Sequence, residues 1–118
     1  MTTKWVDLFK LILARTSDGT LHWSDTADPD AFLTSVGRSK IIYEQGNHIP
    51  GGYSISILSG EGKTIDSFDL VDLSRTTGLD WRAEGEDLFN SIRRRISGAD
   101  EVLDEILDRL NSGNTSEQ

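Results

Sequence analysis

The chain has no cysteine, only two prolines and two histidines, and fewer basic than acidic residues. Without cysteine there is no disulfide framework, no thiol nucleophile and no Cys-based zinc or iron–sulfur site. The 12 Lys and Arg against 20 Asp and Glu give a net charge of −8. This charge argues against a nucleic-acid or anionic-membrane binder, because both need clustered basic side chains. No stretch approaches the roughly 20 apolar residues that span a bilayer.

The length of 118 residues suits one domain with its own core. We expect a single domain over residues 1–111 and a disordered tail over 112–118, because the tail has no apolar residue to anchor it. The apolar stretch at residues 6–14 is interrupted by Asp7 and Lys10, which does not fit a signal peptide. We therefore expect a cytoplasmic protein that binds neither nucleic acid nor membrane.

The hydrophobic periodicity predicts helices and strands that are segregated along the chain. Helical spacing marks a first helix, and period-two alternation or short apolar runs mark about five strands before two further helices. The predicted elements are a helix over residues 5–15, strands over 21–23, 31–36, 39–45, 53–57 and 64–70, and helices over 81–96 and 102–110. This order predicts an α+β fold, in which an antiparallel meander carries both C-terminal helices on one face.

The first helix has an unusually wide apolar stripe. Its six apolar side chains cover roughly 160 degrees, against about 100 degrees for an ordinary surface helix: Trp5, Val6, Leu8, Phe9, Ile12 and Leu13. Leu11 lies outside even this arc, among Lys4, Asp7 and Arg15. The helix is therefore either deeply buried or half of an interface.

Three local signals concern turns and helix ends. Gly37-Arg38 between two strands fits a two-residue type II′ turn with glycine first. Gly85 on the apolar face of the 81–96 helix costs about 1 kcal/mol relative to alanine, which indicates a close approach to the sheet. Gly98 ends that helix, and Ser97-Gly98-Ala99-Asp100 resembles a capping box with Asp in place of Glu.

Two motifs suggest ligand sites but have simpler explanations. Gly60-Glu61-Gly62-Lys63-Thr64 resembles the end of a phosphate-binding loop, yet position 57 is Ile and a strand follows, so we expect a hairpin turn. Asp25, Asp28 and Asp30 lack the alternating spacing of a calcium loop, so we expect solvated carboxylates. The sequence predicts no metal site and no cofactor.

The remaining candidates for chemistry are isolated. His22 and His48 are far apart and no G-x-S-x-G nucleophile elbow is present, so we expect no catalytic residue. Arg93-Arg94-Arg95 cannot form one flat basic face, because consecutive helical residues point 100 degrees apart. We expect these arginines to serve the helix dipole and ion pairs. The loop over residues 46–52 is long for a hairpin, and is either a binding loop or a flexible connector.

One pattern resembles a known group of proteins. The residues Leu11, Thr16, Gly19, Leu21 and Trp23 follow an amphipathic helix and precede short strands, with Gly60-Glu61-Gly62 in a hairpin. The pattern T-x-x-G-x-L-x-W is similar to that of a family of small uncharacterised prokaryotic α+β proteins. The resemblance covers most of residues 5–110 and implies a fold, but no activity for any position.

These observations favour a non-catalytic protein-interaction or regulatory module, acting through a protein partner or through self-association, including as a homodimer. The alternative is a small-molecule or substrate-handling domain with a pocket between sheet and helices. The candidate binding residues for the two hypotheses are Leu11, Tyr43, Asn47, His48 and Tyr53. We also expect a basic surface on any charged partner of the acidic last helix.

Overall fold

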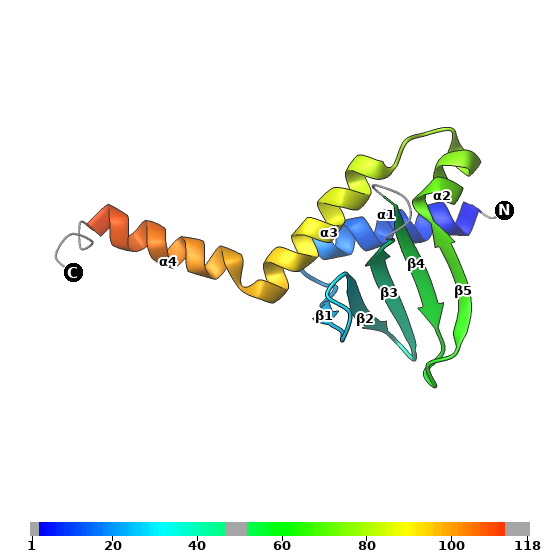
Figure 1. The fold of residues 1–118 in the computed structure, drawn as a ribbon, viewed down its shortest axis with the longest axis horizontal. Helices are drawn as coiled ribbons and strands as arrows, with labels where there is room; N and C mark the ends of the chain where they lie inside the picture. Colours follow the sequence, from blue (N-terminus) through cyan, green and yellow to red (C-terminus); the bar gives the residue numbers. More distant parts are fainter. Residues whose placement is uncertain (1–2, 47–51, 113–118) are drawn as a thin grey trace.

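The computed structural model describes residues 3–46 and 52–112 and confirms the α+β class (Figure 1). In chain order the elements are α1 (Thr3–Ser17), β1 (Ser24–Asp25), β2 (Ala31–Val36), β3 (Ser39–Gln45), β4 (Tyr53–Leu58), β5 (Thr64–Asp69), α2 (Leu70–Thr77), α3 (Arg82–Ser97) and α4 (Ala99–Ser112). The strands form one sheet in the order β1-β2-β3-β4-β5, and every neighbouring pair is antiparallel. This is the meander expected from the sequence.

The turns between strands follow the expected glycine chemistry. Gly37 has a φ of 60°, whereas the φ of Arg38 is not positive. These signs fit the expected type II′ turn and exclude type I′, which needs a positive φ at both residues. Residues 60–64, whose sequence resembles the end of a phosphate-binding loop, belong to a hairpin turn. In this turn the amide of Gly62 donates to the carbonyl of Ser59 at 2.9 Å. A register shift between Ile57 and Leu58 marks a bulge where β4 meets β5.

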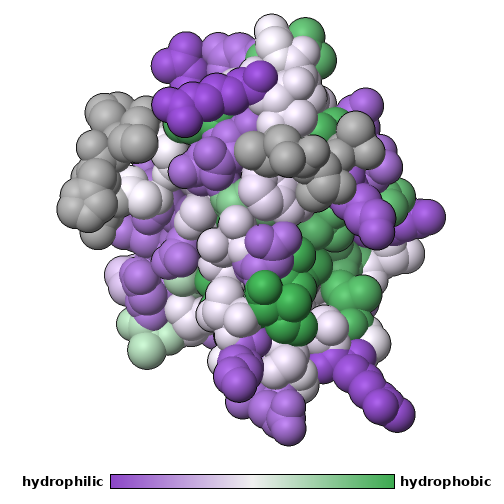
Figure 2. Space-filling view, turned by 90° about the vertical axis from the view of Figure 1, so that its right-hand side faces the viewer, coloured by the Kyte–Doolittle hydropathy of each residue, from purple (hydrophilic) through white to green (hydrophobic). Residues whose placement is uncertain are grey.

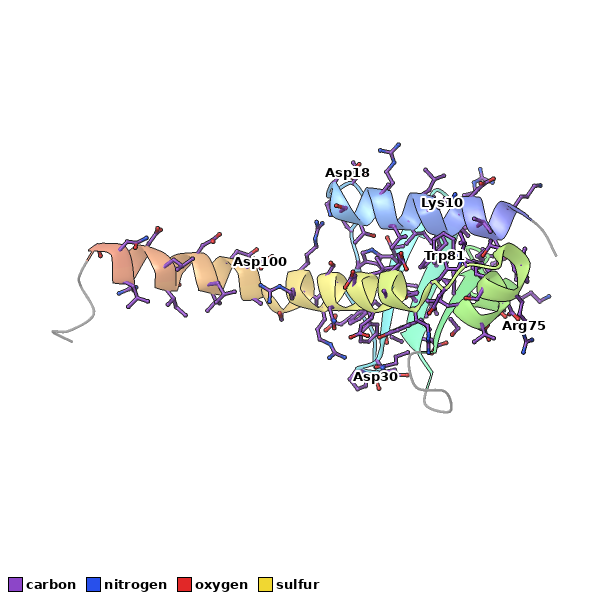
Figure 3. All side chains as sticks on the ribbon, turned by 90° about the horizontal axis from the view of Figure 1, so that it is seen from above. Lys10, Asp18, Asp30, Arg75, Trp81 and Asp100 are labelled. Carbon is purple, nitrogen blue, oxygen red and sulfur yellow. The ribbon has the colours of Figure 1, made fainter. Side chains whose placement is uncertain are left out.

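The core lies between the sheet and the pair of helices α1 and α3, which lie side by side over one sheet face (Figure 3). Alternate residues of β3 and β4 point into this core, as period-two alternation requires. Aromatic rings fill its centre. The fully or nearly fully buried aromatic side chains are Phe9, Phe32, Tyr43, Tyr53, Phe68, Trp81 and Phe89.

Gly85 confirms the expected close approach of α3 to the sheet. A Cβ atom at this position would overlap Leu70 Cδ1, and would lie 3.0 Å from Tyr43 Oη and 3.1 Å from Tyr53 Cδ2. The hydroxyl of Tyr43 also donates a hydrogen bond of 2.8 Å to the Gly85 carbonyl. Only a residue without a side chain lets helix and strands meet at this distance.

Helix α2 was not expected from the sequence. It begins at a capping box in which the Asp69 carboxylate accepts from the amide of Asp72 at 2.7 Å and the Asp72 carboxylate accepts from the amide of Asp69. It buries Leu70 and Leu73 and ends at Gly78 in the left-handed conformation. The helix therefore closes one end of the core directly after the last strand.

Two expectations about element positions are wrong. Residues 21–23 form no strand, and β1 covers only Ser24–Asp25. Leu21 and Trp23 still pack against the core, where Trp23 Nε1 donates to Thr16 Oγ1 at 2.9 Å. The last helix does not cover the sheet: α4 buries none of its residues and extends away from the body (Figure 1). It also continues to Ser112, the first residue of the expected tail, and residues 113–118 lie outside the described part.

Candidate functional site

The direction of α4 is set at its joint with α3. Gly98 adopts φ of 70°, and its amide bonds to the carbonyls of Arg94 and Arg95, so α3 ends there and the chain turns. An ion pair between Arg94 and Asp100 then ties the last turn of α3 to the first turn of α4. Figure 3 labels Asp100 at this joint. Ser97 is the last residue of α3, and its Oγ donates to the carbonyl of Arg94. Because Asp100 also pairs with Arg94, the capping box expected at these two residues is wrong. The joint is thus a defined turn.

An apolar stripe on α4 faces solvent. Its five large side chains keep between 45% and 57% of their surface exposed: Val102, Leu103, Ile106, Leu107 and Leu110. We call these five residues the α4 stripe. They make up five of the nine large apolar side chains that are exposed in the described part of the chain. Isolated exposed apolar residues are ordinary, but a continuous stripe on one helix marks an interaction surface.

The free-energy cost of leaving the α4 stripe exposed to water can be estimated. Burying one large aliphatic side chain is worth about 1.5 to 3 kcal/mol. With roughly half of each side chain exposed, the five residues together forgo about 5 kcal/mol. A 14-residue helix is also marginal in isolation, because most helical stability in proteins comes from packing of the apolar face. A surface that covered the stripe would therefore stabilise α4 itself.

The side of α4 opposite the stripe is acidic. The helix carries five acids and one base, a net charge of −4, of which Arg109 pairs with Glu105 at 3.5 Å. The other acids are Asp100, Glu101, Asp104 and Asp108. Half of the net charge of the chain is therefore carried by this one helix.

The structure separates the residues that the sequence suggested for binding. Leu11 is 54% exposed on α1 and does not belong to the α4 stripe. Tyr43 and Tyr53 are brought together, but as core residues whose rings stack at 5.6 Å. Asn47 and His48 lie outside the described residues.

The two tyrosines act as packing groups. Burial raises the pKa of Tyr43 far above its ordinary value, with the Tyr53 hydroxyl adding to the effect. Burial also raises the pKa of Tyr53, helped by the charge of Glu86 and opposed by that of Arg93. With its hydroxyl held by the Gly85 carbonyl, Tyr43 has its polar atom engaged inside the fold. The small-molecule hypothesis therefore gains little support from this pair.

Three small surface hollows of the described residues lie beside α1, β1 and α3. The first is lined by Thr20, Leu21, His22, Ser24 and residues 33–35. The second is lined by Leu13, Thr16, Ser17, Asp87, Leu88, Ser91 and Arg95, and the third by residues 21–23 with Arg95 and Ile96. Within residues 3–46 and 52–112, no group of three or more His, Asp or Glu side chains is placed to hold a metal ion. In the same ranges, no helix has the length and hydropathy needed to cross a membrane.

The three consecutive arginines of α3 each have a separate partner, as expected. Arg93 lies 4.7 Å from the Phe89 ring centroid and pairs with Asp30 at 3.6 Å. Arg94 pairs with Asp100, and Arg95 donates to the Ser17 carbonyl at 3.2 Å. These arginines therefore connect α3 to the loop before β2, to the start of α4 and to the end of α1.

Apolar surface is not confined to α4. Figure 2 shows the end of the molecule opposite α4, where apolar patches lie among polar and charged side chains. The other large exposed apolar residues are Leu11, Val36, Ile65 and Leu79, which come from four different parts of the chain. They therefore do not lie along a single helix, as the α4 stripe does.

Comparison of the chain with family models, with curated proteins and with solved structures finds no match.

Proposed function

We propose that this chain is a non-catalytic protein-interaction module whose contact element is α4. The observation that carries the proposal is the α4 stripe, a row of half-exposed large apolar side chains on a helix that leaves the body. The sequence suggested an interaction module because the first helix is unusually apolar, the terminal helices are amphipathic and no set of catalytic residues converges. The exposure of the α4 stripe supports the last helix, rather than the first, as the proposed contact surface.

The body that carries α4 has a core of its own. Its core is closed by α1, α2 and α3, and no residue of α4 is buried in it. In the described part of the chain, every buried side-chain nitrogen and oxygen has a hydrogen-bond partner. The body therefore needs nothing from α4, which leaves the helix available for a second molecule.

The size of the surface suits reversible binding. A partner that supplies a matching apolar stripe would bring the gross hydrophobic gain to about 10 kcal/mol. Association costs about 4 to 15 kcal/mol in lost freedom of motion. The two terms nearly balance, so we expect a contact that forms and dissociates readily rather than a permanent complex.

Capture from the organism's own lysate, followed by reconstitution from purified components, tests the proposal. The tagged full chain is compared with Ile106→Glu in the stripe and with Leu79→Glu, which alters a 59% exposed apolar residue of the body. We expect a protein that wild type and Leu79→Glu retain and Ile106→Glu loses, and that binds again after both components are purified. Equal retention by all three chains would show that α4 is not the contact element.

A further inference from the structure

We infer that the occupant of the α4 stripe is the α4 stripe of a second copy, with the two helices antiparallel. This inference rests on the proposed function and names its partner. It is carried by three features of the described chain: the spacing of the apolar residues along α4, the positions of the acids around the helix, and the width of the body at its N-terminal end.

The apolar residues of α4 follow the spacing of a two-helix seam. Ala99, Leu103, Ile106 and Leu110 are separated by four, three and four residues, which is the alternation of the inner positions of a heptad. Val102 and Leu107 flank this row on its two sides. A helix with this pattern packs by inserting each side chain between those of a similar helix.

The acids of α4 lie where they do not oppose such a pairing. Glu101, Asp104, Glu105 and Asp108 occupy the outer positions of the same heptad, which point away from the seam. The two charged residues nearest the seam are Asp100 and Arg109, and each already has an ion-pair partner within its own chain. Two stripes can therefore meet without bringing acids face to face.

The same placement disfavours a basic helix as the partner. Basic side chains on a partner gain most when acids flank the apolar seam, as they do at the flanking positions of charge-specified coiled coils. Here four of the five acids point outward. The charge balance suggests a basic partner, but the electrostatic attraction between such a partner and α4 is weaker than the net charge of −4 implies. A second apolar stripe, in contrast, packs against the α4 stripe without needing charged partners.

Steric bulk sets the orientation. Packed helices lie about 8 to 10 Å apart, while the molecule measures 34 and 27 Å across its two shorter axes. Parallel helices would bring both bodies, each wider than this spacing, to the same end of the pair. Antiparallel helices separate the bodies by the length of α4, about 21 Å for 14 residues. Leu103 then faces Ile106 of the second copy, and Ala99 faces its Leu110.

Sedimentation equilibrium of the full chain tests the pairing over about 5 to 500 µM, because a surface of this size gives a concentration-dependent dimer. We expect a monomer–dimer equilibrium that Ile106→Glu weakens by more than about tenfold and Leu79→Glu leaves unchanged. We also expect tighter association in about 0.5 M NaCl, because salt screens the repulsion between two acidic chains. Leu103→Ser is a second stripe variant, and circular dichroism checks that each variant keeps its fold.

Introduced thiols test the orientation, because the chain has no cysteine of its own. A mixture of Leu103→Cys and Ile106→Cys chains should form a mixed disulfide dimer under mild oxidation. Ser112→Cys alone should not, since the two helix ends lie apart in an antiparallel pair. Efficient cross-linking through Ser112→Cys would overturn the antiparallel arrangement.

The outcomes separate this inference from the proposed function. A wild type that stays monomeric up to about 500 µM overturns self-pairing, while the capture experiment still decides whether α4 binds another protein. A dimer that persists in both stripe variants overturns the inference, because its interface must lie elsewhere. A dimer that salt dissociates points to an ionic interface and overturns the apolar seam.

Discussion

Replacing Gly85 with alanine should destabilise the protein, although the same change usually strengthens a helix. In an exposed helix, glycine to alanine gains about 1 kcal/mol. Here the new methyl group would overlap Leu70 Cδ1 and would press on the Tyr43 hydroxyl and the Tyr53 ring. Overpacking of this kind costs about 1 to 3 kcal/mol, and any shift of α3 also weakens the 2.8 Å bond from Tyr43 to the Gly85 carbonyl.

We expect the losses to exceed the gain by about 1 to 2 kcal/mol, since a strained buried hydrogen bond adds to the overpacking. For a domain of this size the loss lowers the melting temperature by about 4 to 10 °C. Urea unfolding should show a lower midpoint with an unchanged slope. The exposed Asn90→Ala on the same helix is the matched control and should stabilise slightly, by propensity alone.

A double-mutant cycle with Leu70→Ala identifies the overlapping atom. Leu70→Ala alone should cost about 2 to 5 kcal/mol, because it leaves a cavity in the core. Combined with Gly85→Ala, the loss should be smaller than the sum by about 1 kcal/mol or more, since the new methyl group then fills part of the space. A Gly85→Ala protein as stable as wild type or more stable would refute the close packing of α3 around Gly85. Additive losses in the cycle would refute the overlap with Leu70, the first residue of α2.

Three further predictions concern the helices and the core. Deleting residues 99–118 should change the melting temperature of the body by less than about 4 °C, because α4 buries none of its residues in it. Asp69→Ala should cost about 1 kcal/mol in urea unfolding by removing the capping box of α2, whereas Asp69→Asn should retain most of the stability. Burial raises the pKa of Tyr43, so ultraviolet titration should show its ionisation only on unfolding. Stability should be complete below the ordinary tyrosine pKa of about 10 and should fall as pH rises above it, because the unfolded chain can ionise there.

Short-range patterns in the sequence predicted most of the fold. Alternation placed the larger strands, the glycine of the 37–38 turn fixed one hairpin, and Gly85 indicated where α3 approaches the sheet. Helix α2 was missed, although Asp69 and Asp72 have the spacing of a capping box, because the eight-residue helix is too short to show a full apolar period. The expected strand at Leu21 to Trp23 does not form, because these side chains reach the core from a loop that pairs only at Ser24–Asp25.

The candidate site was harder to predict, for a physical reason. An amphipathic pattern shows that one face of a helix favours burial, but it does not identify the covering surface. The sheet face is already occupied by α1 and α3, so the last helix finds no place on it, and this competition is invisible residue by residue. Tyr43 and Tyr53 carry hydroxyls that suggest a ligand site, yet their strand register stacks them inside the core.

The position of the acids on α4 bears on how an exposed apolar helix avoids uncontrolled association. An apolar stripe with no charge nearby would favour open-ended aggregation. On α4 the acids cover the outer face, so a pair of helices that buries both stripes presents mainly negative surface to a third copy. An isologous antiparallel pair is also closed by its two-fold symmetry and leaves no unpaired stripe. Under the proposed pairing, the same arrangement that permits two copies to meet therefore opposes the addition of more.

Replacing Asp104 and Asp108 with asparagine should then raise the tendency to form species larger than a dimer without dissociating the dimer. Light scattering measures this tendency. Species distributions that do not change would show that these acids do not limit assembly.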